Sequence, residues 1–237
     1  MPGSNAAPLS KVTLGWIPKL AMFDLDGTLI DTMGHFANLA ATLIEENYEV
    51  FDSGGAETKV TWALARERYL QTSGIPLRQQ LEVIFPGDKR NDPVAATYER
   101  DKTEICLHAE FPLEVAAALR ELQARGVPVI ISSNSAQHFV DELAARAPVD
   151  FDLALGFGDG VAKGEPHVER VVREFSVEPE DILFCGDSLK DGELAERCGQ
   201  RFVGVIGTFN QDAFEERFEG VHTVESIAHL PALIWGP

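Results

Sequence analysis

Cysteine is scarce in this sequence of 237 residues, which contains only Cys106, Cys185 and Cys198. The three form no C-x-x-C pair and show no cysteine–histidine spacing suited to a metal, so the sequence predicts neither a disulfide framework nor a zinc site. Free thiols persist in a reducing compartment. We therefore predict a cytoplasmic protein.

Basic residues are also few. Twenty lysines and arginines stand against 38 aspartates and glutamates, which gives a formal net charge of −18 at pH 7. Nucleic acids and anionic membrane surfaces attract clustered lysine and arginine, so this composition argues against nucleic acid as a partner. An anionic substrate would need a local binding device instead.

Long apolar runs are absent as well. No window reaches the roughly 18 uninterrupted apolar residues of a membrane helix. The first ten residues do not combine a basic start with an apolar stretch, as a secretory signal does. We predict no membrane segment, and we expect residues 1–17, rich in proline, glycine and serine, to form a flexible tail.

Short apolar runs recur along the rest of the chain and predict buried strands. They cover residues 20–23, 127–132, 153–157, 181–185 and 202–206. Segments with helical spacing lie at residues 113–125, 136–146, 167–175, 190–198, 212–218 and 226–235. This alternation favours an α/β fold in which helices cover both faces of a parallel sheet.

The alternation is interrupted between Thr32 and His108, where helical spacing dominates and no buried strand is predicted. The expected helices cover residues 36–47, 58–71, 77–84 and 93–108. A helical block directly after the first strand is typical of a cap inserted into a core domain. We expect a cap domain over residues 33–109 and a catalytic core formed by residues 18–32 and 110–237.

Polar side chains follow several of the predicted strands. They are Asp24, Asp26, Ser133, Asn134, Lys163, Asp187 and Asp191. Open parallel sheets bind ligands at the carboxyl ends of their strands, so we expect this set to share one rim. Crowded carboxylates repel unless they share a cation, which predicts a hard divalent ion such as Mg2+. A lysine and a hydroxyl suit phosphate oxygens, and the whole set describes a phosphoryl-transfer site.

These residues resemble the four signature motifs of the haloacid dehalogenase (HAD) superfamily, and specifically its capped phosphatase branch of phosphoglycolate phosphatases and β-phosphoglucomutases. The motifs are Asp24-Leu25-Asp26-Gly27-Thr28, then Ser133 with Asn134, then Lys163 followed by Gly164 where the family frequently has proline, and finally Gly186 to Asp191. The resemblance spans residues 18–235. It implies a Rossmann-like core with a central parallel sheet and an inserted α-helical cap of the C1 type.

The resemblance also implies catalytic and metal-binding roles. Asp24 would attack phosphorus and form an aspartyl phosphate, while Asp26 would serve as general acid and base. The Asp24 side chain, the Asp26 backbone carbonyl and Asp187 would bind Mg2+, with Asp191 steadying the site behind them. Retention of Asp26 favours a phosphatase or phosphomutase over an enzyme that cleaves carbon–halogen bonds.

The remaining motif residues are implied to bind phosphate. Ser133 and Lys163 would assist catalysis by holding phosphoryl oxygens, together with the Asn134 backbone. Because Lys163 is expected beside Asp24, it is also expected to keep that carboxylate ionised.

A cap of this type limits the substrate to a small phosphorylated metabolite. The segment from Gln71 to Arg78 resembles the cap loop that contacts the leaving group in relatives, and Arg78 is our candidate substrate contact there. Hinges are expected near residues 31–34 and 110–112. His35 lies near the first hinge and is the candidate to face the site from it.

Three functions fit these observations to different degrees. The first is a Mg2+-dependent phosphatase that hydrolyses a small phosphomonoester. The second is a β-phosphoglucomutase-like phosphomutase, which shares the core motifs and would use a hinge histidine, with His35 as the candidate. The third is a non-catalytic phosphometabolite sensor, for which an eroded motif would be expected although every core carboxylate is present. The sequence makes no prediction about oligomeric state.

Overall fold

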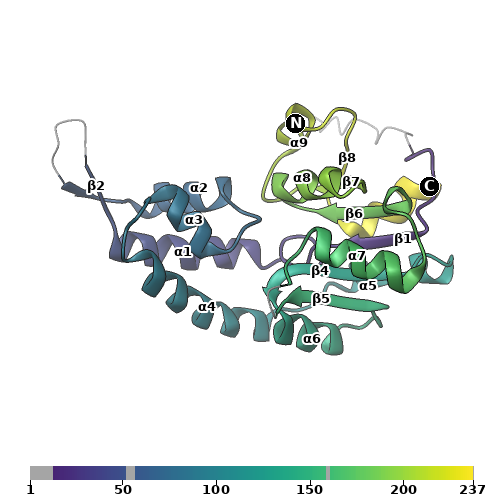
Figure 1. The fold of residues 1–237 in the computed structure, drawn as a ribbon, viewed down its shortest axis with the longest axis horizontal. Helices are drawn as coiled ribbons and strands as arrows, with labels where there is room; N and C mark the ends of the chain where they lie inside the picture. The colour runs from purple at the N-terminus through teal and green to yellow at the C-terminus, as the bar shows by residue number, and fades with distance from the viewer. Residues whose placement is uncertain (1–12, 52–56, 159–160, 237) are drawn as a thin grey trace, which may run out of the picture.

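The computed structural model describes residues 13–51, 57–158 and 161–236. Its main sheet consists of β1 (Leu20–Phe23), β4 (Val129–Ala136), β5 (Leu153–Phe157), β6 (Ile182–Gly186), β7 (Arg201–Val205) and β8 (His222–Val224). The strands lie in the order β5-β4-β1-β6-β7-β8, and every neighbouring pair is parallel (Figure 1). β1 is thus flanked by two strands from much later in the chain.

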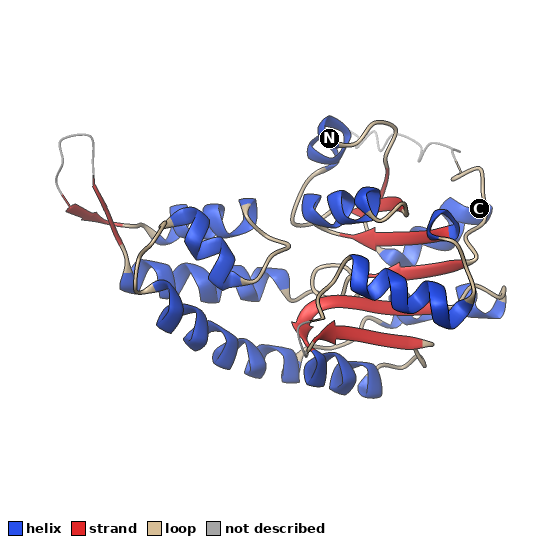
Figure 2. Ribbon diagram, in the orientation of Figure 1, coloured by secondary structure: helices blue, strands red, loops and turns tan. Residues whose placement is uncertain are grey.

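Helices cover both faces of the sheet (Figure 2). Ala21 and Phe23 join one apolar cluster, whereas Leu20 and Met22 join the other, because successive strand residues point to opposite faces. The face with Ala21 and Phe23 packs on α5 (Leu113–Ala124), α6 (Gln137–Arg146), the 3₁₀ turn η2 (Ile227–His229) and α10 (Leu230–Trp235). The face with Leu20 and Met22 packs on α7 (Glu165–Phe175) and α8 (Leu189–Arg197). The 3₁₀ turn η1 (Pro179–Asp181) leads into β6, and α9 (Gln211–Arg217) follows β7.

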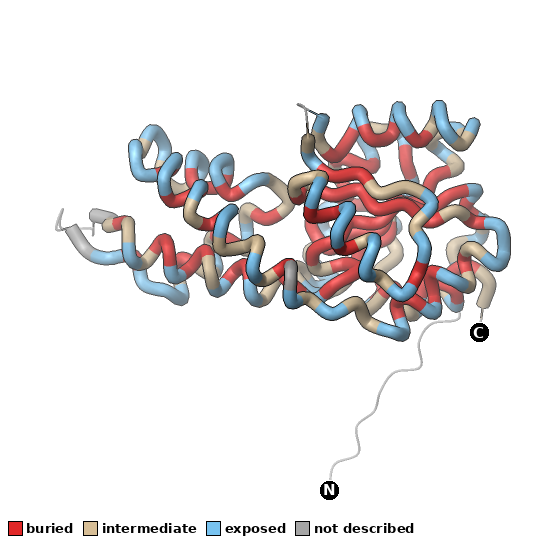
Figure 3. The backbone as a smooth tube through the Cα atoms, turned by 90° about the horizontal axis from the view of Figure 1, so that it is seen from below, coloured by how far each residue is buried: buried red, intermediate tan, exposed pale blue. Residues whose placement is uncertain are grey.

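A group of four helices extends beyond the carboxyl ends of the strands (Figure 1). It contains α1 (Met33–Asn47), α2 (Trp62–Gln71), α3 (Leu77–Ile84) and α4 (Asn91–His108), and we refer to it as the helical insert. Inside it the Tyr48 ring stacks on Phe85 with centroids 4.0 Å apart, and the Tyr48 hydroxyl donates to Asn91 Oδ1 at 2.9 Å. Figure 3 shows buried residues along the strands and on the inward sides of the helices, in the insert as well as around the sheet.

The helical insert departs from the predicted pattern at one place. The helix expected from residue 58 begins at Trp62 instead, and β3 (Glu57–Lys59) pairs with β2 (Glu49–Phe51) as a short antiparallel ladder. Thr61 explains the later start, because its side chain accepts a hydrogen bond from the Leu64 backbone N–H and so caps the helix.

Two features of the main sheet were also not predicted. β8 contains only three residues, too few to give a strand pattern. β4 continues past its apolar run through Ser132 and Asn134 to Ala136, so polar residues form part of a strand that was expected to end at residue 132. The other predicted strands and helices are confirmed to within a few residues.

The last five residues of the predicted tail make contacts with the core. Residues 13–17 lie against the core, where the Leu14 backbone N–H donates to the Leu233 carbonyl and the Arg201 guanidinium lies 4.2 Å from the Trp16 ring centroid. Residues 1–12 lie outside the described residues. None of the helices in the described ranges combines the length and apolar character needed to cross a membrane.

Candidate active site

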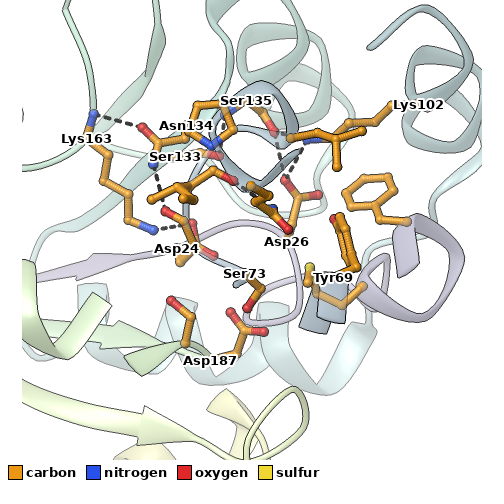
Figure 4. Close-up of a pocket in the computed structure, with 18 of the residues that line it drawn as sticks. Asp24, Asp26, Tyr69, Ser73, Lys102, Ser133, Asn134, Ser135, Lys163 and Asp187 are labelled. Carbon is orange, nitrogen blue, oxygen red and sulfur yellow. Dashed lines mark hydrogen bonds and ion pairs between the residues drawn. The ribbon is translucent and has the colours of Figure 1, made fainter. Parts of the chain in front are cut away.

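The carboxyl ends of β1, β4 and β6 meet beneath the helical insert and enclose a cavity of about 90 Å³. Among its lining residues are Asp24, Asp26, Ser133, Asn134, Lys163 and Asp187, which the sequence predicted to share one rim (Figure 4). Asp191 lies directly behind this wall, in contact with Lys163. Four segments that are distant in the sequence therefore meet at one place.

Lys163 is the central cation of the core side. Its buried ammonium donates to Asp24 Oδ1 at 2.6 Å and pairs with Asp191 Oδ1 at 2.5 Å. Burial alone would lower the pKa of Lys163, but the two carboxylates outweigh it and raise the pKa above its usual value. Lys163 is therefore held in one place as a charged group.

Asp24, Asp187 and Asp191 form a cluster in which carboxylate oxygens lie within 4.8 Å of one another, and all three side chains are buried. Burial raises the pKa of Asp24 to about 7, helped by Asp191 and Asp26, although Lys163 lowers it. Burial and the neighbouring carboxylates also raise the pKa of Asp187 well above its usual range. Lys163 lies beside Asp24 as predicted and favours its ionised form, while burial opposes ionisation.

The chemistry of this cluster fits a divalent cation. Three buried carboxylates face one ammonium, so the set carries an excess of negative charge that a bound ion would compensate. All the donors are oxygens, which suits Mg2+ better than a soft metal. The structure thus brings the predicted ligands Asp24 and Asp187 together with Asp191 in a buried acidic cluster that could hold a divalent cation.

Asp26 lies apart from that cluster and has different partners. The Thr32 hydroxyl donates to its Oδ1 at 2.7 Å, and the Ser135 hydroxyl donates to its Oδ2 at 2.7 Å. The Lys102 ammonium lies 3.8 Å from Oδ2. Sequence reasoning identified Asp26 but missed all three partners.

A glycine in the first motif is required by close packing. Gly27 has φ +83°, and a Cβ built on it would lie 2.4 Å from Asp187 Oδ2. Any larger residue would therefore press on a carboxylate of the cluster while adopting a backbone conformation that L-residues avoid.

We predict that Gly27→Ala lowers the free energy of unfolding by about 2 kcal/mol or more and also impairs the predicted phosphatase activity. Gly34→Ala is the matched control, because a Cβ on this α1 residue would meet nothing within 4 Å and alanine favours a helix. Urea denaturation and an activity assay on both variants test the prediction. Equal behaviour of the two variants would contradict it.

The fourth motif orients its own carboxylates. The Ser188 hydroxyl and backbone N–H both donate to Asp191 Oδ2, which closes a capping box at the start of α8. The Thr208 hydroxyl, in the loop after β7, donates to Asp187 Oδ2. Thr208 was not predicted, since no motif connects that loop to the site.

A buried histidine, His167, links β4 to β5. Its Nε2 lies 3.3 Å from the Gly156 carbonyl, which can only accept, so Nε2 carries the hydrogen and Nδ1 accepts from the Ser132 hydroxyl at 2.9 Å. Burial lowers the pKa of His167 to about 4. Between pH 6.5 and pH 4 an unfolded chain takes up a proton that the folded protein refuses, so stability is lost as pH falls through that range.

We therefore predict that lowering pH from 7 to 5 costs the wild type about 2 kcal/mol more unfolding free energy than it costs His167→Gln. The exposed His138 gives the control variant His138→Gln, which should follow the wild type. Urea denaturation of the three proteins at both pH values measures this difference. A parallel loss in wild type and His167→Gln would refute it.

The helical insert supplies the opposite wall of the cavity with Phe36, Tyr69, Ser73, Tyr98 and Lys102, among other residues. Its loop over residues 72–76 packs tightly on the core. A Cβ on Gly74, which has φ +92°, would lie 2.6 Å from Lys190 Cβ, and the Asn134 side-chain amide donates to the Gly74 carbonyl at 3.3 Å. The loop that the sequence singled out therefore does contact the site.

Two candidates from the helical insert are not brought to the cavity. The Arg78 side chain is 43% exposed, pairs with Glu82 at 2.8 Å and with Asp92, and is not among the residues that line the cavity, so the structure gives its predicted substrate contact no support. His35 is exposed, and its neighbour Phe36 is the residue of that turn that lines the cavity.

Comparison with known proteins agrees with this geometry. The profile of a family described as haloacid dehalogenase-like hydrolases matches residues 18–199. A phosphoglycolate phosphatase of Escherichia coli (strain K12) is 29% identical over 209 residues, covering 79% of this chain and 81% of the relative. One of Photorhabdus laumondii is 29% identical over 199 residues, covering 79% and 80%.

Solved structures share the fold. A haloacid dehalogenase-like family hydrolase from Streptococcus pneumoniae superposes with a TM-score of 0.69 at 17% identity, covering 91% of this chain and 97% of the other. CbbY from Rhodobacter sphaeroides, solved in complex with phosphate, gives a TM-score of 0.65 at 18% identity, covering 90% and 96%. The α/β core and the helical insert are thus a shared architecture.

Proposed function

This chain is an enzyme of the haloacid dehalogenase-like hydrolase family, and on that premise we propose that it is a Mg2+-dependent phosphatase acting on a small phosphomonoester. The observation that carries the proposal is the separation of two neighbouring carboxylates into different environments. Asp24 bonds to Lys163, whereas Asp26 accepts from the hydroxyls of Thr32 and Ser135. Two carboxylates held so differently suit two roles, nucleophile and acid/base.

In the first step Asp24 attacks phosphorus. Lys163 occupies Oδ1, which leaves Oδ2 as the attacking oxygen. The bond between phosphorus and the ester oxygen breaks, Asp26 donates its proton to that oxygen, and the alcohol leaves. An aspartyl phosphate on Asp24 remains.

In the second step a water molecule attacks this phosphorus while Asp26 takes its proton. The bond to Asp24 breaks, which restores the carboxylate and releases inorganic phosphate. Ser133, the Asn134 backbone and Lys163 hold the phosphoryl oxygens in both steps. All three line the cavity, which supports this assignment.

Asp24, Asp187 and the Asp26 backbone carbonyl would hold the Mg2+ ion, with Asp191 behind them. When bound, the ion supplies positive charge that offsets the carboxylates and the transferring phosphoryl group. The buried position of the acidic cluster supports this assignment, and the ion's identity is part of the proposal.

We also propose that residues 33–109 act as a cap over a core of residues 18–32 and 110–237. This proposal is supported by the cavity lining, because the helical insert contributes one wall and the strand ends contribute the other. Residues of both walls line the same cavity, so a substrate bound there would contact the helical insert as well as the strand ends.

One observation weighs against the phosphomutase alternative. That alternative calls for a hinge histidine near Asp26, whereas His35 is exposed and Phe36 lines the cavity. The sensor alternative has no support from the site, where each predicted carboxylate is retained in a connected network. We therefore favour the phosphatase.

The proposal is tested by phosphate release from a panel of small phosphate esters, sugar phosphates and nucleotides, with purified protein and Mg2+. We expect release from one or a few small esters without any requirement for a sugar bisphosphate. Release from none of them, or turnover that requires a bisphosphate, would overturn the proposal.

A further inference from the structure

The wall of the cavity that the helical insert supplies, here called the cap wall, contains a lysine that the proposed reaction does not use. Lys102 lies on α4, and its side chain is 14% exposed. Its Nζ donates to Ser135 Oγ at 3.0 Å and lies 4.5 Å from the centre of the Phe36 ring. Asp26 Oδ2, at 3.8 Å, is too distant for a hydrogen bond. An ammonium has three donors, so two remain without an acceptor among the described residues.

Other donors line the same wall. Ser73 is only 8% exposed, and its hydroxyl has no hydrogen-bond partner in the described part of the chain. The Tyr69 and Tyr98 hydroxyls lie 2.7 Å apart, and since only one hydrogen lies between them, the other hydroxyl keeps its own hydrogen to donate. An unsatisfied buried hydroxyl is costly, and a bound ligand would satisfy it.

The position of these donors relative to Asp26 indicates which part of a bound substrate they would contact. Asp24 and Lys163 lie on one side of Asp26, and Lys102 and Tyr69 lie on the other (Figure 4). In the proposed reaction phosphorus is bound at Asp24 and the ester oxygen at Asp26. The groups beyond Asp26 therefore face the organic part of the leaving alcohol.

The charge of this wall favours an anion. Lys163 is engaged by Asp24 and Asp191, so its charge serves the core side. The helical insert contributes one acidic residue to the cavity lining, the exposed Glu99, and the core carboxylate nearest Lys102 is Asp26, already bonded to two hydroxyls. A carboxylate on the leaving group could accept from the remaining donors of Lys102 and from the Ser73 hydroxyl, and it adds a negative charge beside the ammonium that a neutral leaving group lacks.

We propose that Lys102, with Ser73 and the Tyr69–Tyr98 hydroxyl pair, forms a subsite for a carboxylate on a short leaving alcohol. This inference rests on the proposed phosphatase function and adds the residues that select among its substrates. Lys102 thereby takes the role that the sequence assigned to Arg78.

A pair of matched esters tests the subsite. In 2-phosphoglycolate the leaving group ends in a carboxylate, whereas in 2-hydroxyethyl phosphate a neutral hydroxymethyl group replaces it. Values of kcat and KM are measured for both esters with the wild type, Lys102→Met and Lys102→Arg. Lys89→Met is the control, because Lys89 is an exposed lysine of the same helical insert that does not line the cavity.

We expect the wild type to prefer phosphoglycolate, and Lys102→Met to raise its KM by about 10- to 100-fold, the range for a charged hydrogen bond. The same variant should change kcat/KM for the neutral ester by less than about threefold. Lys102→Arg should recover part of the preference, and Lys89→Met should match the wild type.

A merely structural or positioning role for Lys102 predicts a different pattern. If Lys102 acted only through Asp26, Lys102→Met would lower kcat equally for both esters, and that result would overturn the subsite. An unchanged preference in Lys102→Met would overturn it too. Either outcome leaves the phosphatase standing, whereas a wild type that hydrolyses neither these esters nor the panel above overturns both proposals.

A binding measurement gives a readout that does not depend on turnover. In the Asp24→Asn background, calorimetry should show that adding Lys102→Met weakens the Kd for phosphoglycolate by tenfold or more, with little change for hydroxyethyl phosphate. Thermal melts establish that each variant is folded. Equal weakening for both ligands would contradict the inference.

Discussion

Replacing Asp24 by asparagine is expected to lower phosphate release by roughly 10⁴-fold or more, because an amide cannot serve as the attacking carboxylate. The protein should remain folded. Asp24 is buried beside two other carboxylates, so the neutral amide relieves repulsion, and the melting temperature of the metal-free variant should equal or exceed that of the wild type.

Activity and thermal melts of wild type and Asp24→Asn test this expectation, with Asp212→Asn as a control at an exposed carboxylate of α9. The intermediate itself is open to a second test. Borohydride reduces an aspartyl phosphate to homoserine, which peptide mass spectrometry should locate at position 24 after rapid mixing with substrate. Activity above about one per cent in Asp24→Asn, or homoserine elsewhere, would sink the mechanism.

Removing divalent metal is expected to have the second largest effect, a loss of about 10³-fold or more that added Mg2+ restores. Asp187→Ala should cause a loss of similar size, since it removes a carboxylate from the buried cluster and leaves the Thr208 hydroxyl without its acceptor. Asp212→Ala should have no such effect.

A melting experiment separates metal binding from catalysis. Mg2+ should raise the melting temperature of the wild type, because an ion that binds only the folded state stabilises it, and it should not do so for Asp187→Ala. Full activity of the chelated wild type would remove the metal from the mechanism. A Mg2+ shift that survives in Asp187→Ala would place the ion elsewhere.

The central strands and the polar residues that follow them were predictable together, because a short apolar run ending in a carboxylate marks both the strand and the site residue. In β1, four buried residues from Leu20 to Phe23 are followed at once by Asp24, so the strand and the place where it ends are visible together. Parallel sheets gather such strand ends at one edge. The rim formed by Asp24, Lys163 and Asp187 therefore followed from the order of the segments.

The cap wall could not be predicted in the same way, because it depends on how helices are rotated and docked. Lys102 lies on the buried stripe of α4, with Tyr98 four residues before it and Cys106 four after. A lysine within the apolar stripe of a helix can be recognised in the sequence, but the sequence does not show which residues of the core it faces. Arg78 shows the converse, since this arginine of the predicted loop region pairs with Glu82 and Asp92 and does not line the cavity.

The order of the strands also bears on how the chain reaches its native state. β1 hydrogen-bonds to β4 and β6, so Leu20 must find Ile182 across the whole of the helical insert and much of the core. Pairings between such distant segments form slowly, because closing the long loop between them costs conformational entropy before the contacts stabilise it. During synthesis Asp24, which follows β1, emerges long before its partners Lys163 and Asp187. The acidic cluster is thus assembled only when nearly the entire chain is available, and partly made chains have no active centre.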